Sequence, residues 1–382
     1  MKATCWTRSA DWHDATAIIP MTTDKKINVL VVDDSSVQRM LLVHLLESDP
    51  RVSVIAAVAD GQGALDFIQT TTPDVVLMDL HMPGLDGFET TRRIMETKPL
   101  PIVICSATAR AGDAIIAFRA MEAGAVACLE KPVGRDHADY EKRAGEILRT
   151  VKSMSEVRVV RRWARSPTVP GSGSTAPVVI NGNAPARIRF IGIGTSTGGP
   201  PALQTILAGL PKDFPAPILI VQHIAHGFLS GMADWLGQTT GFRVHIAAHG
   251  VEPIPGHVYL APDNFHLGLN AAGRILLTKE EPENGLRPAV AHLFRSLAET
   301  FGPAAVGVLL TGMGADGAAE LKLMRDRGAV TIAQDRESSV VHGMPAEAIK
   351  LGGATHVLPA DRIAGLLSSL VNGPAQLPER AS

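Results

Sequence analysis

Short apolar runs alternate with segments of helical period over the first third of the chain. Each run is continuously apolar and several are rich in β-branched residues, as expected for parallel strands covered on both faces. These runs lie at 27–32, 74–80, 100–107 and 124–132, the last being the weakest. A helical segment such as 35–48 can be capped by Ser35 or Ser36. Strands that alternate with helices predict a doubly wound α/β sheet, which binds ligands at the carboxyl ends of its strands.

A second α/β region begins near residue 187. Its strands are expected at 188–194, 216–223, 257–262, 305–317 and 329–335, with helical segments between most of them. Two short runs within 265–278 flank an Ala-Ala-Gly turn and predict a β-hairpin. Residues 187–373 are therefore predicted to form a Rossmann-like doubly wound parallel sheet with an inserted hairpin.

The remaining segments lack an apolar period. A last helix of the first region, expected at about 136–155, leads into a stretch rich in Pro, Gly, Ser and Asn, and we interpret 149–186 as a linker after a first domain at 27–148. Residues 1–26 lack the layout of a secretion signal and are expected to be a disordered extension, and 374–382 a disordered tail.

Composition is consistent with two soluble domains. Of 382 residues, 46% are hydrophobic and 19% charged, the length favours more than one core, and the formal charge of −2 argues against a nucleic-acid partner. No apolar run reaches the roughly 18 residues that a membrane span needs. The three cysteines (Cys5, Cys105, Cys128) form no CxxC pair, which excludes a disulfide framework and favours a cytoplasmic protein.

Polar side chains follow the predicted strands of the first region. Asp33 and Asp34 end the first strand, Asp79 the next, Ser106 follows the third and Lys131 the last. The carboxyl ends of parallel strands converge on one crevice, so these groups are expected to meet. Carboxylates with a lysine suit an oxygen-ligated Mg²⁺ site, beside which Asp79 can attack a phosphoryl group.

The motifs "VVDDS", "LMDLHMPGLDG", "CSA" and "EKP" resemble the receiver domain of two-component response regulators, a flavodoxin-like fold. The resemblance implies that Asp79 is the phosphoacceptor and that Mg²⁺ is held by Asp34, Asp79 and the backbone carbonyl of His81, with Asp33 helping. Ser106 and Lys131 would sense the phosphoryl group. Cys128 stands where this family usually has a switch aromatic.

The stretch "GIGTSTGGP" at 192–200 allows two interpretations. A dinucleotide-binding turn requires an acidic residue at the end of the next strand and G-x-G-x-x-G spacing, but that strand ends in Gln222 and His223 and the spacing differs. The alternative is a nucleophile elbow, because G-x-S-x-G around Ser196 lies between a predicted strand and helix. Small neighbours let the backbone turn sharply and expose the hydroxyl. The second interpretation is favoured.

A nucleophilic serine needs a base and an orienting carboxylate. His223 ends the neighbouring strand, and Asp316 follows another, with Asp263 as competitor. Zinc binding by His223 and His226 lacks a third ligand of recognisable spacing. The competing bases are His226, His245, His249, His257 and His266.

Further along, "GTSTGGPPAL", "VQHI", "GHVYLAP", "LTGMGADGA" and "AQDRESSVVHGMPAEAI" resemble the catalytic domain of the chemotaxis protein-glutamate methylesterases, the CheB family. The resemblance implies that Ser196 is the nucleophile, His223 the general base and acid, and Asp316 the orienting acid. The N–H groups near Thr197 and Met313 are its candidates for the oxyanion hole.

This resemblance further implies a phosphorylation-activated hydrolase that demethylates glutamyl methyl esters and deamidates glutamines on the cytoplasmic helices of chemoreceptors. A chemotaxis histidine kinase would be the phosphodonor, and ester hydrolysis would need no cofactor. Ala291 stands where an aspartate is common, His342 replaces an aromatic, and Asp263-Asn264 replaces a Gly pair. A phosphorylation-regulated binding module is the alternative function, whereas a DNA-binding regulator is disfavoured by the absence of a basic recognition helix.

Overall fold

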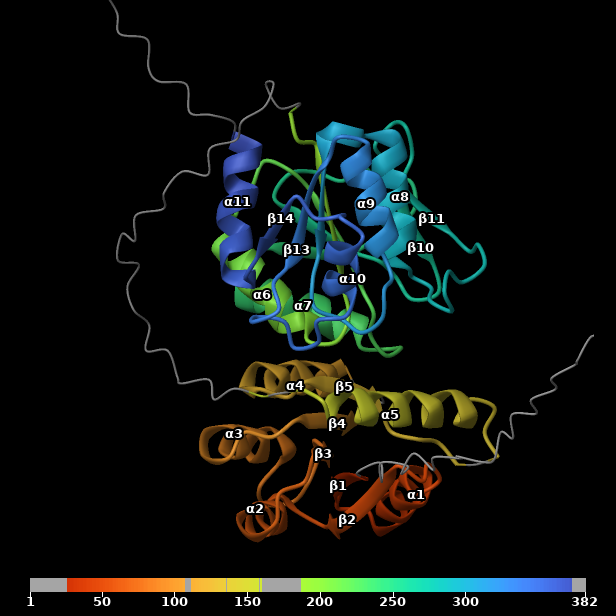
Figure 1. Ribbon diagram of the computed structural model, residues 1–382, viewed down its shortest axis with the longest axis vertical. Coiled ribbons are helices and arrows are strands. Elements are labelled where there is room, and N and C mark those ends of the chain that lie inside the picture. The colour runs from red at the N-terminus through yellow and green to blue at the C-terminus, as the bar shows by residue number, and fades with distance from the viewer. Residues whose placement is uncertain (1–25, 107–110, 135, 158, 160–186, 373–382) are drawn as a thin grey trace, which may run out of the picture.

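A computed structural model describes residues 26–106, 111–134, 136–157, 159 and 187–372, and the expected terminal extension, most of the linker and the tail lie outside them. The first domain has five parallel strands in the order β2-β1-β3-β4-β5 with helices on both faces (Figure 1). Its elements are β1 (Ile27–Val32), α1 (Ser36–Leu46), β2 (Val52–Val58), α2 (Gly61–Thr70), β3 (Val75–Met78), α3 (Gly87–Thr97), β4 (Ile102–Ser106), α4 (Ala111–Ala123), β5 (Ala127–Glu130) and α5 (Tyr140–Met154).

The second domain is a seven-stranded parallel sheet in the order β14-β13-β12-β6-β7-β9-β8, beside an antiparallel hairpin, β10-β11. The predicted fold class, including the hairpin, is confirmed. The elements are β6 (Phe190–Thr195), α6 (Gly199–Gly209), β7 (Ile218–Gln222), α7 (Leu229–Thr240), β8 (Arg243–Ile246), β9 (His257–Leu260), β10 (His266–Leu269), β11 (Ile275–Thr278), α8 (Val290–Thr300), β12 (Ala305–Leu309), α9 (Ala318–Asp326), β13 (Val330–Gln334), α10 (Met344–Lys350), β14 (His356–Leu358) and α11 (Ala360–Asn372).

Three strands of the structure are not among those predicted from the sequence, and all three lie at sheet edges. β2, β8 and β14 each have a neighbour on one side only, and most of their side chains are partly or fully exposed. β8 (RVHI) and β14 (HVL) are short and incompletely covered, so they do not require the continuous apolar run that marked the central strands, whereas β2 (VSVIAAV) is largely apolar and is not among the runs named above. The first-domain boundary expected at residue 148 falls inside α5, which continues to Met154 because Val151 and Met154 are buried.

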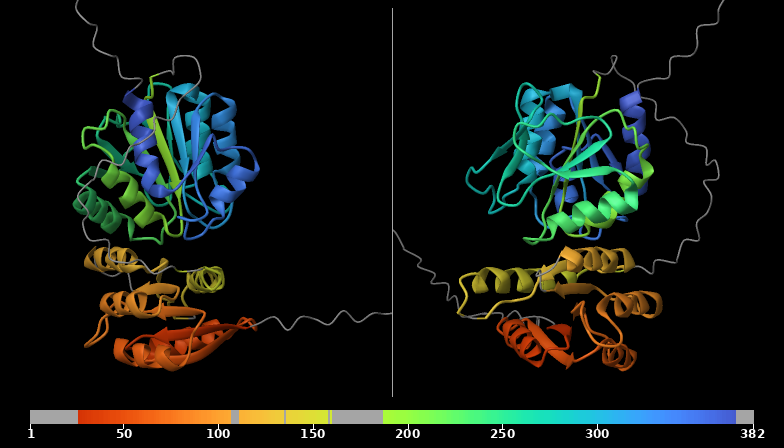
Figure 2. Two further views of the ribbon diagram at one scale, coloured as in Figure 1. Left: turned by 60° about the vertical axis from the view of Figure 1, so that its left-hand side comes forward. Right: turned by 180° about the vertical axis from the view of Figure 1, so that it is seen from behind.

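The two domains pack against each other through α4 and α5 of the first and the α6–α7 side of the second (Figures 1 and 2). Phe118 of α4 stacks on Trp235 of α7 with ring centroids 5.3 Å apart, and both rings are buried. Beside them, Gln204 donates a hydrogen bond to Glu122. One hydrophobic cluster consequently continues from the first domain into the second. Among the described residues, no helix combines the length and apolarity needed to cross a membrane.

Gly87 tests how tightly the first domain is packed. A Cβ there would lie 2.0 Å from the carbonyl oxygen of Asp79, a backbone atom that cannot rotate away. We expect Gly87→Ala to lower the free energy of unfolding by about 1–3 kcal/mol, the usual cost of overpacking. Gly134→Ala is the control, because no heavy atom lies within 4 Å of its added methyl. The stabilities of the two variants are measured by urea unfolding followed by circular dichroism. Equal free energies of unfolding would contradict the close packing at Gly87.

Candidate active site and phosphoacceptor site

Ser196 lies in a tight turn between β6 and α6. Its N–H donates to the carbonyl of Thr311 (3.0 Å), and its own carbonyl accepts from the N–H of Gly199 (2.9 Å). Gly198 has φ +76, in the left-handed region that favours glycine. A Cβ at Gly199 would come within 2.1 Å of the side-chain oxygen of Gln222, so close approach also requires that glycine. The strand, turn and helix have the arrangement expected for a nucleophile elbow.

His223 lies at the end of the adjacent strand. β7 pairs with β6 in parallel, and the N–H of His223 donates to the carbonyl of Thr195 (3.0 Å). The Nε2 atom of His223 lies 2.9 Å from Oδ2 of Asp316, and the two side chains are 13% and 3% exposed. Asp316 belongs to the segment between β12 and α9. Three segments distant in sequence therefore bring serine, histidine and aspartate to one end of the sheet.

Asp316 is also held by the start of α8. Its Oδ2 accepts from the N–H of Val290 (2.7 Å) and its Oδ1 from the N–H of Ala291 (3.1 Å). The first N–H groups of a helix have no intrahelical acceptor and favour negative charge. The carboxylate is therefore fixed in position independently of the imidazole. Ala291, one of the departures noted above, contributes its backbone here and its side chain is buried.

The competing acid and bases have other partners. Asp263 lies 2.8 Å from Nδ1 of His226, whose side chain is 74% exposed, at the rim of the site. Nε2 of His245 lies 2.8 Å from Nδ1 of His257, at the exposed edge of the sheet. The Nδ1 atom of His249 accepts from the N–H of Leu277. The structure thus joins Asp263 to His226 and Asp316 to His223.

Asn264, next to Asp263, has φ 64, a region of backbone conformation that favours glycine but that asparagine tolerates.

A cavity of about 670 Å³ lies between the two domains at this site. Ser196, Thr197, His223 and Met313 line it from the second domain. The other wall comes partly from one face of α5, at positions spaced as successive turns of a helix. Those residues are Lys142, Glu146, Arg149 and Thr150.

The two expected oxyanion-hole residues both reach this cavity. Within the described part of the chain, the backbone N–H groups of Thr197 and Met313 donate no hydrogen bond, so both remain available to a ligand. The Met313 side chain is 43% exposed, and its Sδ accepts from the Ser153 hydroxyl of α5 (2.7 Å). The candidate hole and the first domain are therefore in direct contact.

The acidic residues of the first domain gather at the carboxyl ends of its strands. Nζ of Lys131 lies 2.7 Å from Asp33 and 2.8 Å from Asp79, and these carboxylates are almost fully buried. Asp33, Asp34 and Asp79 have oxygens within 4.8 Å of one another. Three carboxylates so close together suit a hard divalent cation. Burial raises the pKa of Asp79, and Lys131 opposes this effect.

The remaining predicted residues of the first domain lie around this cluster. Ser106 is fully buried, and its hydroxyl has no hydrogen-bond partner among the described residues. His81 lies just beyond Asp79 in the chain and its side chain is exposed. Cys128 is half-buried on β5 and lines the interdomain cavity, and burial raises the pKa of its thiol. The thiol is much smaller than the aromatic ring usual in this position.

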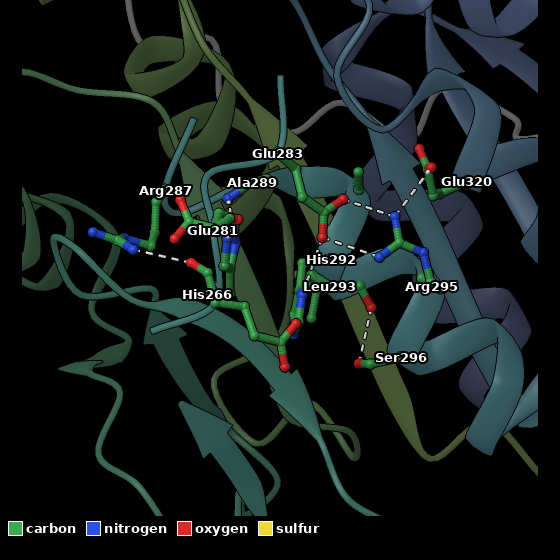
Figure 3. Close-up of polar contacts among 12 residues, drawn as sticks. His266, Glu281, Glu283, Arg287, Ala289, His292, Leu293, Arg295, Ser296 and Glu320 are labelled. Carbon is green, nitrogen blue, oxygen red and sulfur yellow. Dashed lines mark hydrogen bonds and ion pairs between the residues drawn. The ribbon is translucent and has the colours of Figure 1, made fainter. Parts of the chain in front are cut away.

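A second polar cluster, His266, Glu283 and His292, lies beside the hairpin (Figure 3). His266 stacks on His292 with ring centroids 4.7 Å apart. Its Nδ1 accepts from the N–H of Ala289 (3.3 Å), and its Nε2 donates to the carbonyl of Glu281 (3.1 Å). Both ring nitrogens are thus occupied by the segment that leads into α8.

Glu283 of this cluster is engaged by α8. Arg295 binds both of its oxygens, at 3.0 and 2.7 Å, and Nδ1 of His292 lies 3.2 Å away (Figure 3). Arg295 holds the pKa of Glu283 below its ordinary value. Because Arg295 and His292 engage Glu283 and both ring nitrogens of His266 are hydrogen-bonded, this cluster ties the cavity rim at 284–288 to α8.

Comparison with known proteins agrees with this geometry. The family model "CheB methylesterase" matches residues 191–367, and "Response regulator receiver domain" matches 29–139. A Nitrosospira multiformis protein named protein-glutamate methylesterase/protein-glutamine glutaminase is 52% identical over 346 residues, covering 90% of this chain and 97% of the relative. The chain belongs to the CheB methylesterase family.

A second relative covers a similar extent, and a solved structure covers about half of this chain. A Geobacter metallireducens protein with the same description, numbered 4, is 52% identical and spans 90% of this chain and 99% of its own. The crystal structure of the Thermotoga maritima CheB methylesterase catalytic domain is 42% identical, with a TM-score of 0.47, and covers 49% of this chain and all of that one. The family models and the relatives more than 50% identical confirm the family resemblance inferred from the motifs.

Removing the Asp316 carboxylate tests its role as a cap of α8. We expect Asp316→Ala to lower the free energy of unfolding by about 1–3 kcal/mol, because two buried N–H groups lose their acceptor. Asp263→Ala removes the half-exposed partner of an exposed histidine, so its cost should stay below about 1 kcal/mol. Urea unfolding compares the two, and equal stability of the variants would contradict the capping role.

Proposed function

We propose that this CheB-family chain hydrolyses glutamyl γ-methyl esters, and deamidates particular glutamines, on the cytoplasmic helices of chemoreceptors. The observation that carries the proposal is Ser196 at a strand-to-helix turn, lining one cavity with His223, whose Nε2 lies 2.9 Å from Asp316. The curated relatives described as protein-glutamate methylesterase/protein-glutamine glutaminase support the choice of substrate. The protein would act in the cytoplasm, where those receptor helices lie.

The proposed mechanism begins with proton transfer from Ser196 to His223. Because Nε2 of His223 lies against Asp316, Nδ1 is the ring nitrogen left to take the proton. Ser196 Oγ then bonds to the ester carbonyl carbon, whose oxygen becomes negatively charged. Asp316 stabilises the imidazolium, as the acid of a triad does. The same carboxylate cannot rotate freely, because the start of α8 holds both of its oxygens.

The tetrahedral intermediate collapses when His223 returns the proton to the leaving oxygen, releasing methanol. Water then attacks the acyl-enzyme while His223 takes one of its protons, and His223 passes that proton to Ser196 Oγ as the bond to the acyl carbon breaks, which restores glutamate and the free serine. The unengaged N–H groups of Thr197 and Met313 would stabilise the oxyanion at both steps. Deamidation follows the same route, with ammonia as the leaving group.

The first domain is proposed to regulate this site. Asp79 would accept a phosphoryl group from a chemotaxis histidine kinase, with Ser106 and Lys131 contacting its oxygens. Mg²⁺ held by Asp33, Asp34, Asp79 and the His81 carbonyl would neutralise phosphoryl charge. The face of α5 that lines the cavity restricts access to Ser196, so weakening that contact would raise activity. A change of a few kcal/mol in the free-energy difference between the packed and the separated arrangement of the domains is sufficient for this regulation.

In this proposal the receiver comprises 27–148 together with the rest of α5, and 187–373 is the catalytic domain. The linker assigned to 149–186 then begins after α5. Such an arrangement allows the two domains to separate while they stay tethered, which regulation by release requires.

The triad assignment is tested by methanol release from a methylated receptor. We expect Ser196→Ala to abolish release and Asp316→Ala to lower kcat by about 10⁴-fold, the scale on which triad acids contribute. Asp263→Ala should retain activity, because that carboxylate pairs with the exposed His226. Turnover near that of the unsubstituted chain from either triad variant would refute the assignment.

Glu146 gives a pH-dependent test of regulation. It lines the interdomain cavity, and burial raises its pKa from the ordinary value of 4.5. Loss of its proton therefore destabilises the arrangement in which the two domains are packed together. This destabilisation is absent below pH 4.5, where the carboxyl is protonated in both arrangements. It grows as the pH rises and is complete above the raised pKa. Glu146→Gln removes this penalty.

We therefore expect Glu146→Gln to lower unphosphorylated methanol release severalfold at pH 7, with the difference shrinking towards pH 5. Glu141→Gln is the matched control, because it makes the same charge change at an exposed position of α5. Equal basal rates for the two variants at every pH would count against a closed, inhibited arrangement governed by this contact.

A further inference from the structure

Gln222 joins the nucleophile and the base through one side chain. It is the last residue of β7, it precedes His223 in the chain, and it is 5% exposed. Its Nε2 donates to the carbonyl of Ser196 (2.8 Å) and to the carbonyl of His223 (2.7 Å). A single amide group therefore ties together the backbones that carry the two reacting side chains.

The hydrogen bonds of Gln222 exclude a direct role in the chemistry. An amide nitrogen has two N–H donors, and both are used by backbone carbonyls, so neither is available to an oxyanion. Exchanging the oxygen and nitrogen positions would place Oε1 against the same two carbonyls, which is repulsive. The effect of Gln222 must therefore pass through Ser196 and His223.

The side-chain oxygen of Gln222 is buried without a hydrogen-bond partner among the described residues. It lies against the start of α6, where a Cβ at Gly199 would come within 2.1 Å of it. Leaving a buried acceptor unpaired costs about 1–3 kcal/mol. This cost offsets stability gained from the two donated hydrogen bonds, so Gln222 adds little net stability while it links the Ser196 and His223 backbones.

Gln334 shows what a fully satisfied glutamine looks like in the same sheet. It ends β13, is fully buried, and its Oε1 accepts from the N–H of Thr311 (2.8 Å). Its Nε2 donates to the carbonyl and the hydroxyl of Ser338 (2.9 and 3.1 Å). Gln334 bonds to neither Ser196 nor His223 and reaches the Ser196 turn only through Thr311, so it serves as a control for the loss of a buried glutamine one residue further from the nucleophile.

We propose that Gln222 is a positioning residue that sets the separation and orientation of Ser196 and His223. The inference rests on the proposed function for its biological meaning, but it concerns the reactivity of Ser196 itself. The Ser196 carbonyl is held by Gly199 and by Gln222 together. Removing the Gln222 donors leaves the turn held on the α6 side only and frees the carbonyl of the base residue.

The test measures how fast Ser196 reacts with a fluorophosphonate probe, which requires no receptor. Gln222→Met keeps the side-chain length and removes both donors. A displacement of about 1 Å between reacting groups can lower a reaction rate by about 10²-fold. We therefore expect the rate of phosphonylation, and kcat for methanol release from a methylated receptor, to fall by about that factor, while KM for the receptor changes less than about twofold. Gln334→Met should lose stability but keep a phosphonylation rate close to that of the unsubstituted chain.

Gln222→Glu is a second variant that separates positioning from folding. A neutral carboxyl can donate one hydrogen bond to a carbonyl, whereas an ionised one donates none and repels both carbonyls. The rate of this variant, divided by that of the unsubstituted chain at the same pH, should therefore rise as pH falls. Thermal unfolding measured at each pH identifies the temperatures at which every variant is folded.

The outcomes distinguish this inference from the proposed function. Phosphonylation of folded Gln222→Met within threefold of the unsubstituted chain would overturn the positioning role, as would equal losses in the Gln222→Met and Gln334→Met variants. A pH-independent ratio for Gln222→Glu would also overturn it. If the variants behave as expected but the unsubstituted chain releases no methanol from any methylated receptor, the proposed function fails and the positioning role stands.

Discussion

The contact between the Asp316 carboxylate and the start of α8 is the constraint on which the catalytic end of the sheet depends. One oxygen accepts from Val290 and also faces His223, while the other accepts from Ala291. A helix start, a strand-end loop and an imidazole are thereby fixed around one buried anion. The ion pair of Glu283 with Arg295 joins α8 to the segment that forms the cavity rim. Helix and rim therefore act as a single rigid support for the histidine.

Much of the candidate site could be predicted from the sequence, because parallel strands end at one edge of their sheet. Strand-end residues such as Asp79, Lys131, Ser196 and His223 follow from that rule alone, and the structure brings each set together. Choosing between Asp316 and Asp263 could not be done this way. The choice depends on which loop lies above His223, and this is decided by packing of α8 and the hairpin.

Other features could not be predicted because they depend on contacts between distant segments. The edge strands β8 and β14 lack the burial that produces an apolar run. The α5 face that lines the cavity looks in sequence like any solvated helix face, since Lys142, Glu146 and Arg149 are charged. Likewise, the sequence shows Gln222 only as a polar residue at the end of a strand, and its link to Ser196 and His223 depends on two hydrogen bonds that the sequence does not reveal.

The stacked pair formed by Phe118 and Trp235 has a consequence for any separation of the domains. Each ring is at most 1% exposed, and the apolar cluster around them crosses the domain boundary. Separation of the domains would expose both rings to solvent at once. The separated form therefore presents an exposed apolar surface, able to bind other apolar surfaces, as well as an open cavity. The fluorescence emission of the Trp235 indole is sensitive to exposure to solvent, so this emission is expected to change when the domains separate.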